Sequence, residues 1–256
     1  MTSTVQLLQE QFRHLRMVET AEELPILLRH AEKSSWTYQE FLHELLMHEM
    51  KKREEKGIQK RLKWASFPYF KTLDEFNVEE QISLSTRQLN QLSELNWLEQ
   101  QYNLILLGPP GSGKTHISIG LGVEAIQKGF KVAFSTMGEL IHLLKTEEYI
   151  TKSKLRLKRI KESDLVIIDD LMYMAMDQRE ANLFFHLVNH LYERSSIILT
   201  SNKGPEEWGE LMGDQGITTA ILDRLLHRVE VIQMNENDSY RIKNRTTIFE
   251  RESVQN

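Results

Sequence analysis

The sequence contains no cysteine, and this absence removes several kinds of chemistry. Disulfide bonds, thiolate nucleophiles, cysteine-ligated zinc and iron–sulfur clusters all need that side chain. Prolines and glycines are few, at 5 and 12 of the 256 residues, which excludes collagen-like and proline-rich disordered chains. With 40% hydrophobic and 27% charged residues, the chain has the composition of an ordinary globular protein.

Long apolar runs are also absent. No run approaches the roughly 18 residues that cross a membrane, and residues 1–10 lack the basic start and apolar stretch of a secretory signal. We therefore expect a cytoplasmic protein with no membrane partner. The net charge of −5 gives no overall basic signature, although local basic patches are hidden in that sum.

Helical spacing of apolar residues dominates the first part of the chain. Residues such as Leu24, Leu27 and Leu28 recur at this spacing across about 5–56, which predicts an all-helical segment. The pattern becomes irregular around Pro68, and strands and helices alternate after it. We place a helical domain at residues 1–66, a linker at 67–82 and a second domain at 83–256.

Short apolar runs and amphipathic helices alternate through the second domain. A helix at about 85–98 precedes the first run. Such alternation predicts a three-layer α/β fold, with a mostly parallel sheet covered by helices on both faces. The expected strands are Asn103 to Leu107, Lys131 to Thr136, Leu165 to Asp169, Ser196 to Ser201 and Arg228 to Met234.

A phosphate-binding motif follows the first expected strand and opens a helix expected at Thr115 to Lys128. Glycines let backbone N–H groups turn toward phosphate oxygens, and the helix N-terminus adds partial positive charge. We expect Lys114 to reach the β and γ phosphates of a nucleotide and the Thr115 hydroxyl to ligate Mg²⁺. The motif comprises Gly108, Pro109, Pro110, Gly111, Ser112, Gly113, Lys114 and Thr115.

Polar residues end two later strands and complete the predicted hydrolytic site. Asp169 would hold Mg²⁺ through its water shell, and Asp170 would orient or deprotonate the attacking water. Asn202 would hydrogen-bond the γ phosphate or that water. Asn202 and Lys203 begin like a guanine-reading motif, but Pro205 replaces the aspartate that recognises guanine, so ATP is favoured over GTP.

An arginine lies on a helix just before the last expected strand. In ring or filament ATPases, such an arginine enters the neighbouring subunit's site and stabilises charge on the transferring phosphoryl group. We predict this role for Arg224, with Arg228 as the second candidate. An alternative is an ion pair between Arg224 and Asp223 or another nearby acid.

These motifs together resemble a known family. GPPGSGKT, LVIIDD, LTSNKG-PEEWGE and TAILDRLLHR, in this order, are similar to the IstB-type ATPases of insertion sequences. That family is a branch of the AAA+ superfamily close to the DnaC-like helicase loaders. The resemblance implies an ATPase that oligomerises on duplex DNA through nucleotide-bridged interfaces and helps a partner transposase select and engage its target. A DnaC-like helicase loader is the alternative.

The chain is short after its last expected strand. Only 22 residues follow Met234, so we expect the C-terminal AAA+ lid to be absent or reduced to one helix. The lid arginine that normally contacts the γ phosphate therefore has no secure counterpart. Arg241 and Arg245 are weak candidates.

Two local basic patches could contact the DNA backbone without reading bases. A solvated charged face is the alternative for each. The first patch contains Lys51, Lys52, Arg53, Lys60, Arg61 and Lys63, and the second contains Lys154, Arg156, Lys158 and Arg159.

Three other readings can be weighed. A P-loop kinase needs an acceptor pocket and an arginine-rich lid, and a non-hydrolysing protein would keep ATP only between subunits. A zinc protease is disfavoured because His43 and His48 are five residues apart rather than four.

Asp177 and Glu180 have the spacing of a helix capping box, so Glu180 need not be catalytic.

Overall fold

The computed structural model describes residues 4–78, 83–171, 175–208 and 215–235. Contacts within the chain divide it into two compact units, Met1–Lys60 and Arg61–Asn256. The division falls within a long helix, α3, that spans Tyr38–Ala65. The functional division at residues 66 and 67 stays a prediction.

The first unit is helical, as the apolar spacing predicts. It comprises α1 (Thr4–His14), α2 (Val18–Lys33) and the first part of α3. The carboxylate of Glu49 on α3 is buried, and it accepts hydrogen bonds from the Thr20 N–H at 2.8 Å and the Thr20 hydroxyl at 2.9 Å. This carboxylate therefore ties the first turn of α2 to α3.

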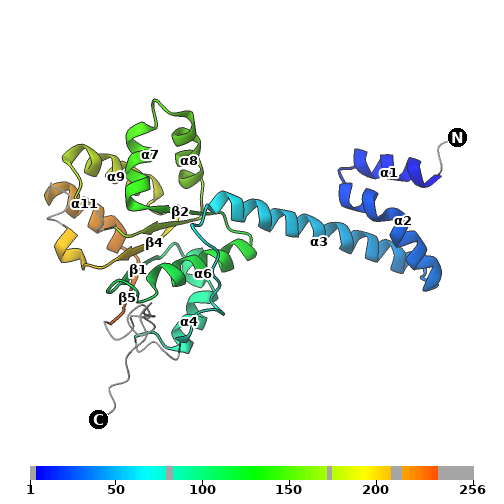
Figure 1. The fold of residues 1–256 in the computed structure, drawn as a ribbon, viewed down its shortest axis with the longest axis horizontal. Helices are drawn as coiled ribbons and strands as arrows, with labels where there is room; N and C mark the ends of the chain where they lie inside the picture. Colours follow the sequence, from blue (N-terminus) through cyan, green and yellow to red (C-terminus); the bar gives the residue numbers. More distant parts are fainter. Residues whose placement is uncertain (1–3, 79–82, 172–174, 209–214, 236–256) are drawn as a thin grey trace, which may run out of the picture. The chain divides into compact units, whose positions relative to one another are not determined.

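The second unit contains a parallel five-stranded sheet with the order β2-β3-β4-β1-β5, which confirms the predicted α/β class (Figure 1). Apolar runs form these strands because both faces of the sheet are covered, so that alternate residues need not be polar. Three predicted strands match the structure residue for residue. Of the two others, β2 begins one residue later than predicted, and β5 is one residue shorter at each end. The strands are β1 (Asn103–Leu107), β2 (Val132–Thr136), β3 (Leu165–Asp169), β4 (Ser196–Ser201) and β5 (Val229–Gln233).

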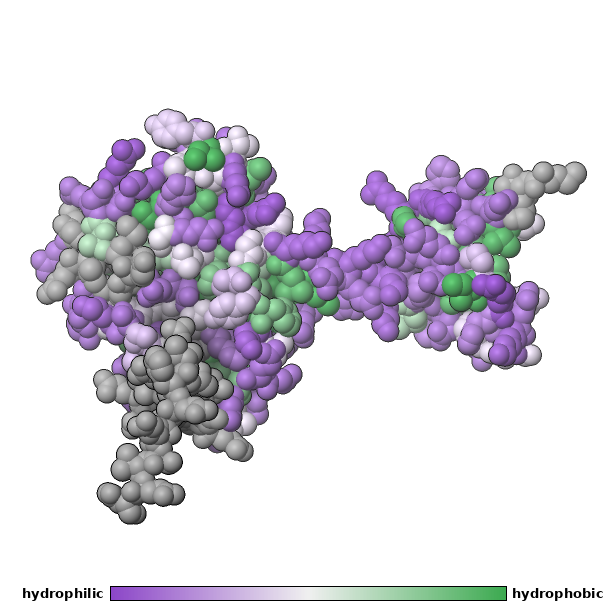
Figure 2. All heavy atoms as spheres, in the orientation of Figure 1, coloured by the Kyte–Doolittle hydropathy of each residue, from purple (hydrophilic) through white to green (hydrophobic). Residues whose placement is uncertain are grey.

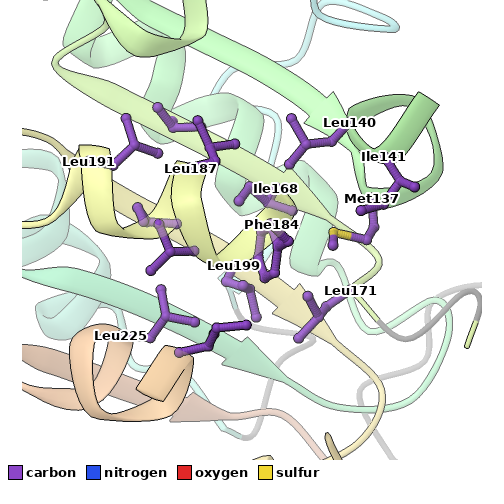
Figure 3. Packing of buried hydrophobic residues seen from close by; sticks show 14 of the residues in the cluster. Met137, Leu140, Ile141, Ile168, Leu171, Phe184, Leu187, Leu191, Leu199 and Leu225 are labelled. Atoms are coloured by element: carbon purple, nitrogen blue, oxygen red, sulfur yellow. The ribbon is translucent and has the colours of Figure 1, made fainter. Parts of the chain in front are cut away.

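Helices lie on both faces of this sheet (Figure 1). One face carries α4 (Thr86–Ser93) and α6 (Lys114–Gln127), and the other carries α7 (Met137–Thr146), α8 (Thr151–Lys161), α9 (Gln178–Leu191) and α11 (Gln215–Leu226). Figure 3 shows part of the core on the second face, where Phe184 and Leu187 of α9 point toward Ile168 and Leu199 of the sheet. This packing fixes the strand ends from which the site is built.

The prediction of one continuous helix at about 85–98 is wrong, because this segment forms two helices, α4 and α5 (Asn96–Glu99). Leu95 adopts φ of 61°, in the left-handed region, and its side chain is only 1% exposed. Burial of this leucine outweighs the cost of a conformation that non-glycine residues disfavour. The local apolar spacing gave no sign of this reversal.

Hydrophilic side chains cover most of the visible surface of each unit (Figure 2). Among the described residues, no helix combines the length and apolar character needed to cross a bilayer.

Candidate nucleotide-binding site

The predicted phosphate-binding motif forms the turn between β1 and α6. Gly111 has φ of 86° and Gly113 has φ of 96°, conformations that favour glycine. Gly113 is the N-cap of α6, so the loop runs directly into the N-terminus of a 14-residue helix. The motif therefore has the strand–loop–helix setting in which backbone N–H groups and the helix terminus bind phosphate.

This loop is packed between the linker and the end of β5. A Cβ atom at Gly113 would lie 2.7 Å from Cε2 of Phe76, and one at Gly108 would lie 2.6 Å from the carbonyl oxygen of Met234. The His116 ring Nε2 also donates to the Thr72 carbonyl at 2.9 Å. The linker is thus part of the nucleotide site's wall, a role that the sequence analysis missed.

The ammonium group of Lys114 is held over the loop. It donates to the carbonyl oxygens of Gly108 at 2.7 Å and Pro109 at 2.8 Å. These contacts hold the positive charge of Lys114 beside the loop that would bind phosphate.

Three side chains that end separate strands or begin α6 meet beside the loop. The Thr115 hydroxyl donates to both carboxylate oxygens of Asp169, at 2.9 and 3.1 Å. The Thr200 hydroxyl donates to Asp169 Oδ1 at 2.7 Å. The structure therefore brings together the two residues predicted to hold a metal, and it adds Thr200, which the sequence analysis did not single out.

The donor set at this point suits Mg²⁺. It consists of a hydroxyl and a carboxylate, the hard oxygen ligands that this ion prefers, on Thr115 and Asp169. Within the described ranges, no three histidine or acidic residues gather as a metal site. One carboxylate and one hydroxyl are donors of the kind that Mg²⁺ takes when it keeps several water ligands and also binds substrate phosphates.

The other two predicted catalytic residues follow the adjacent strand ends. Asp170 is exposed, and its N–H donates to Thr200 Oγ1 at 2.8 Å. Asn202 is also exposed and comes directly after Ser201, whose carbonyl oxygen accepts from the Gly108 N–H at 3.1 Å. Both residues therefore lie at the carboxyl edge of the sheet, beside the phosphate-binding loop.

Arg224 and Arg228 lie at the opposite edge of the sheet. They precede the amino end of β5, whereas the phosphate-binding loop follows the carboxyl end of the parallel strand β1. Arg224 donates to Asn189 Oδ1 at 2.9 Å and packs 4.9 Å above the Phe185 ring, so its partner is an amide and a ring rather than Asp223. Both arginines therefore lie at the ends of the strands opposite to those that the phosphate-binding loop follows.

The second basic patch is divided by the structure. Lys154, Lys158 and Arg159 are exposed on α8, and Arg159 lies 5.3 Å over the Trp64 ring. Arg156 points inward with a side chain only 10% exposed, and its guanidinium donates to the carbonyls of Trp64, Ala65 and Phe134. We therefore remove Arg156 from the predicted DNA surface, because its donors already cap the end of α3.

The first basic patch is a mixture of exposed and paired cations. Lys51 and Lys60 are exposed. Lys52 pairs with Glu55 at 3.0 Å, and Arg53 pairs with Glu49 at 2.7 Å.

The patch continues into the second unit. Lys63 is exposed there, and Arg61 donates to the Ile126 carbonyl at 3.2 Å.

Two further predictions can be placed. The capping box of Asp177 and Glu180 is confirmed at the start of α9. The predicted reduction of the lid, with Arg241 and Arg245 as its candidate arginines, concerns residues outside the described ranges.

Comparison with known proteins assigns the family. Residues 10–248 match the model of the IstB-like ATP binding proteins. An insertion sequence IS21 putative ATP-binding protein from Pseudomonas aeruginosa is 40% identical over 229 residues, which cover 90% of this chain and 86% of that protein. An IS21-like putative ATP-binding protein from Bacteroides fragilis is 39% identical over 245 residues, covering 96% and 93%.

The fold is similar to that of a replication initiator. AMPPCP-bound DnaA from Aquifex aeolicus matches with a TM-score of 0.53 and 25% identity, over 66% of this chain and 50% of that chain. The nucleotide site, the AAA+ architecture and the family match agree. The chain therefore belongs to the IstB-like ATP-binding proteins of insertion sequences.

Proposed function

We propose that this protein is a Mg²⁺-dependent ATPase that oligomerises on duplex DNA and helps a partner transposase select and engage its target. The observation that carries the ATPase part is the hydrogen-bonded group of Thr115, Asp169 and Thr200 beside the glycine loop. Family membership supports the role in transposition.

Each residue of the site has a distinct task in hydrolysis. Lys114 and the loop N–H groups bind the β and γ phosphates. Thr115 and Asp169 would hold a magnesium ion, which supplies positive charge that offsets charge on the transferring phosphoryl group. Asp170 orients the attacking water and accepts its proton, and Asn202 hydrogen-bonds the γ phosphate or that water.

Arg224 completes the site of a neighbouring subunit. Its position at the sheet edge opposite the phosphate-binding loop supports this, because an arginine there faces away from its own nucleotide. In a head-to-tail assembly, the edge that carries Arg224 meets the next subunit's nucleotide edge. ATP then joins the subunits, and hydrolysis loosens the assembly.

Duplex DNA is held through its phosphates by the exposed cations of α8, namely Lys154, Lys158 and Arg159, with Lys63 as a further contact. Their exposure supports this binding, and lysine and arginine on phosphates give affinity that is salt-sensitive and nearly independent of sequence. The cations at Lys51 and Lys60 are proposed to add contacts from the first unit.

ATP turnover with and without duplex DNA tests the ATPase and DNA parts together. We expect turnover to rise when DNA is added and to need no small-molecule acceptor. Lys114→Ala should abolish both turnover and ATP-dependent assembly on DNA, measured by electron microscopy and sedimentation. Assembly of Lys114→Ala at the wild-type level would refute the nucleotide-bridged interface, and co-purification with a replicative helicase instead of a transposase would refute the client.

The trans role of Arg224 has its own test by subunit mixing. Lys114→Ala lacks a working nucleotide site but keeps the arginine, whereas Arg224→Ala lacks the arginine but keeps the nucleotide site. Each variant should be inactive alone, and a mixture should recover part of the ATPase activity. A mixture as inactive as its components would remove Arg224 from the neighbour's site.

The DNA surface is tested by the salt dependence of affinity. Each phosphate contact contributes about 0.9 to the slope of log affinity against log salt on duplex DNA. The double variant Lys154→Ala, Lys158→Ala should therefore reduce that slope by roughly 2. Lys128→Ala, at an exposed lysine after α6, is the matched control and should leave it unchanged. An unaltered slope in the double variant would exclude α8 from the DNA surface.

A further inference from the structure

One buried hydroxyl contacts both carboxylate residues of the site. Thr200 is 1% exposed near the end of β4. Its hydroxyl donates to Asp169 Oδ1 at 2.7 Å and accepts from the Asp170 N–H at 2.8 Å. Its carbonyl oxygen accepts from the Leu171 N–H at 3.0 Å. Thr200 thus hydrogen-bonds to three consecutive residues, Asp169 at the end of β3 and the following Asp170 and Leu171.

These contacts begin where the regular pairing of the two strands ends. The register of β3 and β4 stops at the pair Ile168 and Leu199. Asp170, which follows β3, adopts φ of 59°, a left-handed conformation that a non-glycine residue disfavours. The hydrogen bonds of Thr200 therefore continue the contact between the two strands beyond their last paired residues. They also stabilise the left-handed conformation of Asp170.

We propose that Thr200 is a positioning residue for the two carboxylates, setting Asp169 toward the metal and Asp170 toward the attacking water. The proposal rests on the hydrolytic function proposed above. Thr200 contacts neither nucleotide nor metal in this assignment. It acts through the orientation of Asp169 and through the backbone that carries Asp170.

The chemistry of threonine suits both tasks. A hydroxyl can donate and accept at once, which neither valine nor alanine can do. The branched Cβ restricts χ1, so the hydroxyl is directed without further packing. Loss of such outer contacts to a metal-binding carboxylate typically changes metal affinity or activity by about 10–100-fold.

Thr200→Val, Thr200→Ser and Thr200→Ala test the proposal together. Valine keeps the volume but removes the hydroxyl, and serine and alanine differ from each other by that hydroxyl alone. We expect Thr200→Val and Thr200→Ala to lower kcat by about 10–100-fold, with little change in nucleotide affinity measured without Mg²⁺. Thr200→Ser should stay close to the wild type.

Two readouts do not depend on turnover. The gain in affinity for a fluorescent ATP analogue when Mg²⁺ is added should shrink in Thr200→Ala and persist in Thr200→Ser. Amide hydrogen exchange of Asp170, without nucleotide, should accelerate in Thr200→Ala and Thr200→Val but not in Thr200→Ser. Ser195→Ala is the matched control, because it also loses a buried hydroxyl, one that donates to the Ser163 carbonyl at 2.7 Å away from the site.

The outcomes separate this proposal from the one on which it rests. A wild-type protein that binds ATP but never hydrolyses it refutes the ATPase proposal, while Mg²⁺-linked affinity and hydrogen exchange still decide the role of Thr200. Equal behaviour of the serine and alanine variants overturns that role, whether both are impaired or neither is. If Thr200→Val does not fold, the serine and alanine pair gives the same decision.

Discussion

Replacement of Arg156 tests whether this inward arginine stabilises the second unit. Its guanidinium donates to the Trp64 carbonyl at 3.0 Å and the Ala65 carbonyl at 3.4 Å, and also to the carbonyl of Phe134 on β2. Trp64 and Ala65 end α3, where helix carbonyls have no partner within the helix. Arg156→Ala would therefore remove the charged donor from these oxygens and leave the Trp64 carbonyl only the longer bond from the Ser66 hydroxyl at 3.3 Å.

The size of the effect follows from these contacts. A hydrogen bond from a charged donor contributes about 1.5–3 kcal/mol, and several are lost at once. Burial opposes the charged guanidinium and lowers the pKa of Arg156, which offsets part of that gain. We therefore expect a loss of about 2–4 kcal/mol. For a unit of this size, the melting temperature should fall by roughly 4–16 °C.

Differential scanning calorimetry of the full chain measures this change. Lys154→Ala, at an exposed position of the same helix, is the control and should change stability by less than about 0.5 kcal/mol. Arg156→Lys keeps the charge but loses the planar fork of donors, so it should recover only part of the stability. A loss in Arg156→Ala no larger than in Lys154→Ala would refute a structural role for Arg156.

Two further predictions concern the phosphate-binding loop and the first unit. Gly113→Ala should destabilise the second unit by about 2–4 kcal/mol, because its left-handed backbone would be strained and its new methyl would meet the Phe76 ring. Chemical denaturation measures this loss, and a neutral result would contradict the packing of linker on loop. Burial raises the pKa of Glu49, but hydrogen bonds from Thr20 and Arg53 outweigh it and leave that pKa below its ordinary value. The stabilisation by Glu49 is therefore present above about pH 4.3 and is lost as the pH falls further, so Glu49→Gln should flatten the acid-induced loss of helix seen by circular dichroism. Equal acid profiles would contradict that role.

The sequence by itself determined the architecture and the position of the nucleotide site. Strands such as Asn103–Leu107 and Leu165–Asp169 could be predicted to the residue, because a doubly covered sheet demands continuous apolar runs. The glycine loop could be assigned because its chemistry lies in consecutive residues. Asp169 could be placed beside Thr115 because parallel strands bring their carboxyl ends to one edge.

Only the tertiary structure showed which side chains contact the site or the core from segments that are distant in the sequence. The hydroxyl of Thr200, the contact of Phe76 with the loop and the inward direction of Arg156 each join segments far apart in the chain. Local periodicity reports only which face of an element a residue occupies. The left-handed conformation of Leu95 could not be predicted either, since nothing in the local apolar spacing indicates it and the residue is buried in the folded unit.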